Sequence, residues 1–250
     1  MSKFIERLQQ VMTPSVQSMG FMTAKAQCAR PKIQLVLNVN ASKAKTQIKE
    51  AAGADALLFS NGAVDCGETV TGMRLVKGDA EEVEKAVKAG ADFVVLPLSG
   101  EVLAPDKKVG KIIQIEDAIT DIMLRTVSDL PADAVLLMED KENSLSLTWK
   151  RLMLIRKFAS LSGKPLLIEV LASVKETELQ QIWDAGVSGV VVRIDAEQAE
   201  AAAANLRQII EKLTFPSKQK NGKNMAIVPA VTVAAEAPKE DDDDDDDDDE

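Results

Sequence analysis

The chain has 250 residues, of which 46% are apolar and only 3% aromatic, and its formal net charge is −10 with no His and no Tyr. This length suits one large domain or two small ones, with a core built mainly from aliphatic side chains. The scarcity of aromatic rings argues against stacking of nucleic-acid bases. The lack of His excludes Ser-His and Cys-His nucleophile systems and His-bound metal centres.

The chain begins with a pattern typical of a short amphipathic helix over residues 3–12. Phe4, Ile5, Leu8 and Val11 or Met12 recur at helical spacing on one side of it. A loop rich in Met and Ser follows, so residues 1–31 are predicted to form an N-terminal helix and loop that precede the main domain.

Four segments of the main domain then repeat one pattern of a helix end, a short turn and a buried strand. Ala-Gly-Ala-Asp before an apolar run stands at 52–59 and 89–96, and related versions stand at 130–137 and 185–192. The glycines fall where a helix ends and the backbone needs a positive φ. The short, continuous apolar runs are typical of parallel strands that are covered on both faces.

Eight strands are predicted between residues 32 and 215, at 33–38, 56–59, 73–76, 93–96, 111–115, 134–138, 165–170 and 190–194. Helices are predicted after six of them, at 42–52, 79–89, 117–129, 144–161, 173–185 and 196–213. Right-handed crossovers and closure favour an α/β fold, a single (β/α)8 TIM barrel over 32–215. A doubly wound open sheet is the alternative, but no Gly-x-Gly-x-x-Gly follows an early strand.

The composition changes after the last predicted helix, and residues 216–250 are predicted to form a disordered linker and acidic tail. Residues 240–250 are all Asp or Glu, and without these eleven the chain has 29 acidic and 30 basic residues. The tail is either a solvated, solubilising segment or an electrostatic attractant for a basic protein partner or for cations.

Targeting and thiol signals are weak. No apolar run approaches the ~18 residues of a transmembrane helix, and the first residues lack the apolar core of a secretory signal. Cys28 and Cys66 are predicted to be free thiols, and Cys66 has no neighbouring base that would make it a nucleophile. We therefore expect a cytoplasmic protein that binds neither membranes nor nucleic acid.

Active sites of TIM barrels lie at the C-terminal ends of the strands. Those ends are polar in this chain, with acids after the fifth, sixth and seventh strands and cations after the third and eighth. The residues there are Asn38, Asn40, Ser60, Asn61, Lys77, Ser99, Glu116, Asp117, Glu139, Asp140, Glu169, Arg193 and Asp195.

These residue types allow several kinds of chemistry. Glu116, Glu139 and Glu169 could converge on Mg²⁺ or Mn²⁺ acting as a Lewis acid, or they could be helix-start or solvated rim residues. Lys77 could form a Schiff base after desolvation, or bind an anion. Arg193 could bind a carboxylate or phosphate through two hydrogen bonds, or form an ion pair with Glu169 or Asp195.

The Ala-Gly-Ala-Asp repeats over residues 32–213 resemble the aldolase-type, phosphate-binding TIM-barrel superfamily. In many members strand eight ends in Gly-Ser and its backbone cradles a phosphate. This chain has Arg193-Ile194 at the matching place, where Arg193 would supply a different anion contact.

Residues 113–118, Ile-Gln-Ile-Glu-Asp-Ala, are similar to the Gln-Ile-Glu strand of the HpcH/HpaI aldolase-like family, whose glutamate binds Mg²⁺. That resemblance implies Glu116 as a ligand and a second carboxylate near Lys141, where the nearest acids are Asp140 and Glu142. The family's catalytic histidine has no counterpart in this chain.

Two functions follow from this pattern. The first is an aldolase- or lyase-type enzyme for a small carboxylated or phosphorylated metabolite, assisted by Mg²⁺ or Mn²⁺. Its predicted residues are Glu116, Glu139 and Lys77 for catalysis, Glu116, Glu139 and Asp140 for the metal, and Arg193, Glu169, Asn38 and Ser60 for the substrate. The second is a barrel without catalysis that serves as a binding or assembly scaffold, with its acidic tail engaging a basic partner.

Overall fold

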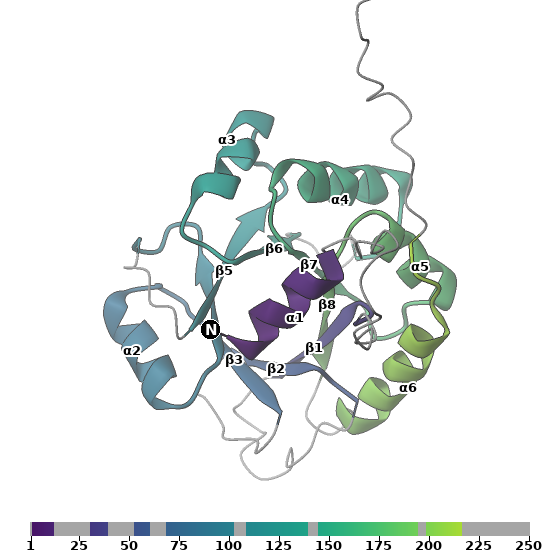
Figure 1. Cartoon of the computed structure of the whole chain (residues 1–250), viewed down its shortest axis with the longest axis horizontal. Coiled ribbons are helices and arrows are strands. Elements are labelled where there is room, and N and C mark those ends of the chain that lie inside the picture. The colour runs from purple at the N-terminus through teal and green to yellow at the C-terminus, as the bar shows by residue number, and fades with distance from the viewer. Residues whose placement is uncertain are drawn as a thin grey trace, which may run out of the picture. The chain divides into compact units, whose positions relative to one another are not determined.

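The computed structural model describes residues 2–12, 31–39, 53–60, 69–102, 109–139, 145–194 and 199–216. Eight parallel strands follow one another around a closed barrel, and the last pairs with the first (Figure 1). This arrangement confirms the predicted (β/α)8 fold. The strands are β1 (Gln34–Val39), β2 (Ala56–Phe59), β3 (Val70–Arg74), β4 (Phe93–Pro97), β5 (Gly110–Glu116), β6 (Ala134–Met138), β7 (Leu166–Val170) and β8 (Gly189–Ile194).

Helices pack against this barrel, and some begin later than the sequence predicts. They are α1 (Lys3–Met12), α2 (Ala80–Lys88), α3 (Asp121–Thr126), the 3-10 helix η1 (Val127–Asp129), α4 (Trp149–Leu161), α5 (Glu176–Asp184) and α6 (Ala199–Lys212). The side chains of Thr120 and Thr148 accept hydrogen bonds from the backbone of the first turns of α3 and α4, which fixes both starting points. The predicted helix over 42–52 and all but the first residue of the tail predicted over 216–250 lie outside the described residues.

Side chains alternate between the two faces of the barrel wall. One set, which includes Val36, Leu58, Ile112, Leu136 and Val191, fills the interior. The opposite set packs under the helices and includes Leu37, Leu137, Ile168 and Val192. This alternation decides which residues at the strand ends face the interior.

Helix α1 closes the N-terminal end of the barrel (Figure 1). Phe4 and Leu8 are fully buried, and the Phe4 ring stacks on Phe93 with ring centroids 4.6 Å apart. The ring of Phe93 in turn fills the space beside Gly72, where a Cβ atom would lie 2.2 Å from it. The amphipathic pattern of residues 3–12 therefore marks a part of the core.

The aspartate of the repeated pattern has a structural role. Asp55 accepts a hydrogen bond from the backbone N–H of Leu35, and Asp133 accepts one from Lys111, both at 2.8 Å. Each carboxylate thus joins its own strand to the preceding one. Asp92 binds α1 instead, and accepts from Ser2 Oγ at 2.6 Å and from the N–H groups of Lys3 and Phe4 at 3.0 Å.

The substitution Asp92→Ala is expected to lower the free energy of unfolding by about 1–2 kcal/mol, because it removes the acceptor for the first N–H groups of α1. Urea denaturation followed by circular dichroism measures this change. Glu211→Ala, at an exposed position of α6, is the control and should change stability by less than about 0.5 kcal/mol. Equal effects of the two substitutions would contradict the role of Asp92 as a helix cap.

In the part of the chain that the structure describes, no helix has the length and apolarity needed to cross a membrane.

Candidate functional site

A group of polar side chains lies at the C-terminal end of the barrel. Alternation along β1, β2, β3, β7 and β8 places five residues on the interior side: Asn38, Ser60, Arg74, Glu169 and Arg193. We refer to these five residues as the mouth cluster. Four of them are the residues predicted to bind substrate, and Arg74 is an addition.

Glu169 is the centre of the mouth cluster. Its side chain is only 2% exposed, and each carboxylate oxygen meets a different arginine. Arg74 Nη2 lies 3.1 Å from Oε1, and Arg193 Nη2 lies 2.6 Å from Oε2. Two guanidinium groups around one carboxylate leave a net charge of +1, which suits an incoming anion.

The two arginines differ in exposure. The Arg193 side chain is 45% exposed, whereas that of Arg74 is 18% exposed. Arg74 also points Nη2 at the sulfur of Met138, 3.1 Å away, and its Nε is buried with no hydrogen-bond partner among the described residues. An unpartnered buried donor is costly, and an acceptor on a bound ligand would relieve that cost.

Asn38 and Ser60 complete the cluster on the neighbouring strands. Ser60 Oγ donates to Asn38 Oδ1 at 3.2 Å, and Asn38 is the register partner of Arg193 across the β1–β8 pair. The mouth cluster therefore offers a cationic side and a neutral hydrogen-bonding side around one end of the barrel.

Sequence reasoning missed Arg74 because it placed the third strand at 73–76, whereas β3 is Val70–Arg74. That prediction relied on the apolar pair Leu75-Val76, but β3 pairs with β2 from Val70 to Met73. Lys77 was therefore expected at the strand end, where the structure has Arg74. Lys77 is exposed beyond the strand, and its backbone N–H donates to Glu82 Oε2 at 3.1 Å.

The predicted acids after β5 and β6 lie on different faces of the barrel wall. Glu116 is the exposed last residue of β5, on the interior side in alternation with Ile112 and Gln114. Glu139 follows Met138 and, like Val135 and Leu137, lies on the side of the barrel wall that faces the helices. It forms an ion pair with Arg151 of α4 at 2.7 Å. Asp140, Asn40, Asn61 and Asp195 lie outside the described residues.

Arg151 anchors α4 to the end of β7. Its side chain is 4% exposed, and besides Glu139 it donates to the backbone carbonyl of Glu169 at 2.5 Å and to that of Leu145. Glu139 and Arg151 together therefore fix the backbone from which the Glu169 side chain reaches the mouth cluster.

The described acids do not form a donor set for a divalent cation. Mg²⁺ and Mn²⁺ require several oxygen ligands around one point. Among the residues that the structure describes, no three His, Cys, Asp or Glu side chains lie together in that way, and both Glu139 and Glu169 face arginines. We therefore assign no chemical step to a metal, and the Mg²⁺ or Mn²⁺ site stays a prediction of the sequence.

Comparisons with known proteins relate the chain to other barrels by structure alone. A mutant tryptophan synthase alpha-subunit from Pyrococcus furiosus matches 73% of this chain and 98% of its own, with 13% identity and a TM-score of 0.52. The 3-keto-L-gulonate-6-phosphate decarboxylase from Vibrio cholerae matches 74% of this chain and 100% of its own, with 14% identity and a TM-score of 0.56. No protein-family model and no curated protein sequence matches. At these identities the comparisons show the TIM-barrel fold.

Proposed function

We propose that the chain is an enzyme of aldolase or lyase type that binds a small carboxylated or phosphorylated metabolite at the mouth cluster. The observation that carries this proposal is the pairing of the buried Glu169 with two arginines at the catalytic end of a TIM barrel. A similar barrel is a decarboxylase of a sugar phosphate by name, which supports this general class by analogy of fold.

Binding would proceed by exchange of ion pairs. Arg193 is the more exposed of the two cations. An incoming carboxylate or phosphate would therefore replace Glu169 Oε2 as the partner of the Arg193 guanidinium and form charge-assisted hydrogen bonds with it. Asn38 and Ser60 would then orient the neutral part of the metabolite through their amide and hydroxyl groups.

Cleavage of a carbon–carbon bond next to a carbonyl places negative charge on the carbonyl oxygen. Arg74 would stabilise that charge with its unpartnered Nε donor. Of the three residues predicted to be catalytic, Glu116 has its carboxylate exposed on the interior side of its strand, and we assign the proton transfer to it. Glu139 would position β7 through its ion pair with Arg151, which donates to the Glu169 carbonyl. Lys77 would contribute an exposed positive charge beyond the end of β3.

A thermal-shift screen of the full chain tests the binding step, with inorganic phosphate, glycerol 3-phosphate and a set of short keto acids as probes. A ligand at 100 times its dissociation constant adds about 2.7 kcal/mol to the free energy of unfolding. Arg193→Ala should weaken binding at least tenfold without unfolding the chain, because Arg193 is 45% exposed and the buried Glu169 keeps its ion pair with Arg74. Arg125→Ala, at an exposed arginine of α3, is the matched control and should leave binding unchanged.

Turnover of the best ligand then separates the enzyme from a binding scaffold. Glu116→Gln should abolish turnover while ligand affinity stays within about threefold. Binding without turnover in the unmodified chain would support the scaffold function instead, and the absence of any shift across the panel would contradict both the ligand class and the mouth cluster as its site.

A further inference from the structure

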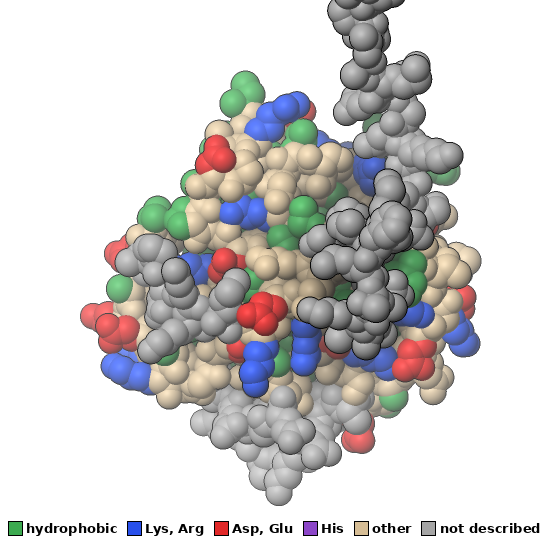
Figure 2. All heavy atoms as spheres, in the orientation of Figure 1, with side chains coloured by type: hydrophobic (Ala, Val, Ile, Leu, Met, Phe, Trp, Pro, Cys, Tyr) green, Lys and Arg blue, Asp and Glu red, His purple; other side chains and the backbone are tan. Residues whose placement is uncertain are grey.

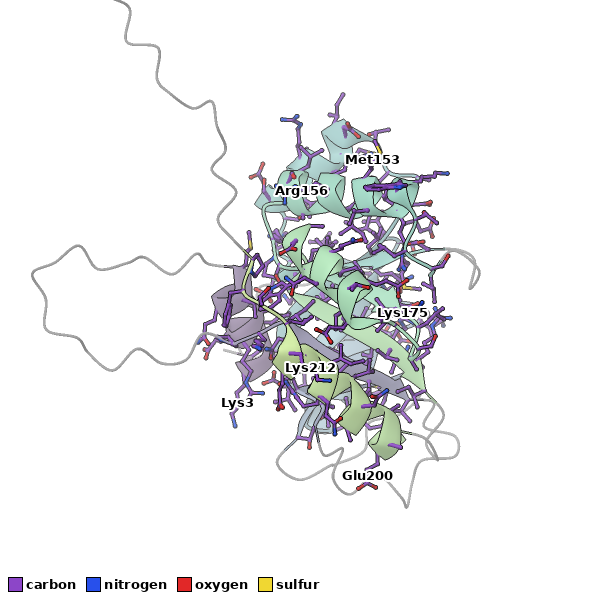
Figure 3. The ribbon with its side chains drawn as sticks, turned by 90° about the vertical axis from the view of Figure 1, so that its right-hand side faces the viewer. Lys3, Met153, Arg156, Lys175, Glu200 and Lys212 are labelled. Atoms are coloured by element: carbon purple, nitrogen blue, oxygen red, sulfur yellow. The ribbon has the colours of Figure 1, made fainter. Side chains whose placement is uncertain are left out.

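A cavity of about 300 Å³ lies at the end of the barrel opposite the mouth cluster. Its wall comes from the last turn of α1, the second half of α4, the turn between α5 and β8, and residues that precede β7 and follow α6. Figure 3 shows Arg156 of α4 at the same end of the barrel as Lys3 of α1, while Lys175 stands at the other end. The surface at this end carries acidic and basic groups side by side (Figure 2).

The polar part of the cavity wall is cationic. Lys164 and Arg156 contribute two positive charges, and Asp184 contributes the one negative charge among the described lining residues. The Asp184 carboxylate accepts a hydrogen bond from Gln180 Nε2 at 3.1 Å. The wall therefore has a net charge of +1.

Lys164 keeps donor capacity for a ligand. Its Nζ donates to the carbonyls of Leu130 and Ala132, at 2.7 and 2.5 Å, and an ammonium group has three N–H donors. Burial lowers the pKa of Lys164, and the charges of Asp133 and Asp129 offset part of that effect. A partly desolvated ammonium gains more from an added anion than a hydrated one does.

Most of the other lining side chains are apolar. Val11, Ala159, Trp183 and Val187 border the same space, and Trp183 is 3% exposed with its ring packed on Phe215 at a centroid distance of 5.3 Å. The hydroxyl of Ser188, fully buried and without a hydrogen-bond partner among the described residues, also lies at this wall. Cations beside an apolar surface suit an anion that carries a short hydrocarbon body.

We infer that this cavity is a binding site for a small organic carboxylate and is separate from the mouth cluster. Lys164 and Arg156 bind the carboxylate group of this ligand. Val11, Ala159 and Trp183 contact the apolar part of the ligand. A volume of about 300 Å³ is at the lower end of the range for small-molecule sites, so the ligand is a compact metabolite. The site lies on the face that holds α1, and a ligand bound there would raise the free energy of unfolding of the folded barrel by mass action.

Tryptophan fluorescence tests this inference directly. The chain has two Trp residues, and Trp149→Phe leaves Trp183, in the cavity wall, as the reporter. Butyrate is the probe and butyramide is its neutral counterpart, with ionic strength held constant by NaCl. We expect a saturable change in Trp183 fluorescence with butyrate in the millimolar range and at least tenfold weaker binding of butyramide.

Three further variants in this background locate the site. Lys164→Met should weaken butyrate binding at least tenfold, and Ala159→Leu should do the same by filling the cavity while leaving Lys164 and its backbone contacts in place. Lys150→Met, which removes an exposed lysine of α4, is the matched control and should change the affinity less than twofold.

The source of the carboxylate is tested by changing Asp241–Asp249 to Asn. An unchanged butyrate affinity assigns the site to a free carboxylate, and a higher affinity shows that the chain's own acidic stretch competes for the same site. Any of three results would overturn the inference. The first is equal affinity for butyrate and butyramide, and the second is an equal effect of Lys164→Met and Lys150→Met. The third is the absence of a saturable fluorescence change up to about 50 mM butyrate, which is very weak binding. None of these results depends on the function proposed for the mouth cluster.

Discussion

Replacing Arg151 with Met is expected to lower the free energy of unfolding by about 3–5 kcal/mol, the largest electrostatic effect that we predict for this chain. The Arg151 and Glu139 side chains are 4% and 8% exposed, and their charged atoms are 2.7 Å apart. Without the guanidinium, the Glu139 carboxylate would stay buried with no opposing charge at that distance. The carbonyls of Leu145 and Glu169 would also lose their donor. Urea denaturation at neutral pH measures the change.

A double-mutant cycle separates the ion pair from the packing of the Arg151 side chain. The double variant Glu139→Leu with Arg151→Met should be less destabilised than the sum of the single variants, with a coupling energy of about 1–3 kcal/mol. Lys157→Met is the matched control, because Lys157 pairs with Asp121 at the surface, where the side chains are 32% and 64% exposed. Its effect should stay below about 1 kcal/mol. Similar losses for Arg151→Met and Lys157→Met would contradict a structural role for the buried pair.

The Phe4→Ala substitution is expected to cost about 3–5 kcal/mol of unfolding free energy, which is typical for truncation of a fully buried aromatic side chain. Phe4 is fully buried and stacks on Phe93 at the N-terminal end of the barrel. Its loss would leave a cavity between α1 and the barrel interior, because Phe93 is itself packed against Gly72 and cannot move into the space without a gap elsewhere.

Thermal and urea unfolding of Phe4→Ala measure this cost, with Met12→Ala in the same helix as the control. Met12 is 43% exposed, so its truncation should cost about 1 kcal/mol or less. If both variants lost the same small amount of stability, α1 would contribute little to the barrel core, in conflict with the burial of its apolar side.

The residues that hold α1 and the arginines of the mouth cluster have different roles. The N-terminal end holds α1 through Phe4 and Asp92, and the C-terminal end presents the arginines around Glu169. Stability is expected to respond to the first set of residues and ligand binding to the second. The cavity beside Lys164 is the proposed exception, because a ligand would bind there at the same end of the barrel as α1.

Local patterns were sufficient for the architecture. The spacing of Phe4, Leu8 and Val11 predicted the bounds of α1, since one face of a short helix has to bury its apolar side chains. The repeated glycine and aspartate before each apolar run predicted where helices end and strands begin. Gly53, Gly90 and Gly186 do have positive φ values of 107°, 86° and 105°. Eight strands in sequence order close into a barrel because each strand pairs with the next.

The inclusion of Arg74 in the mouth cluster and the exclusion of Glu139 and Lys77 required the tertiary structure. Successive side chains of a strand point to opposite faces of the sheet. In β6 this alternation places Met138 on the interior side and the following Glu139 under α4. The polar sequence Glu139-Asp140 does not by itself show which of these faces Glu139 occupies. The last residue of β3, Arg74, is the register partner of Val95 in β4, so Arg74 and not Lys77 is the cation at the mouth.

The sequence by itself determined the barrel, its N-terminal helix and four of the five residues in the mouth cluster, because apolar periodicity and strand ends are local properties of the chain. Only the tertiary structure decided which charges meet. Arg74 and Glu169 are separated by 95 positions, and the closure of the barrel brings them within 3.1 Å. Arg151 is buried against Glu139 because α4 packs across β6 and β7. Contacts of this kind depend on how whole elements pack, and no window of the sequence contains that information.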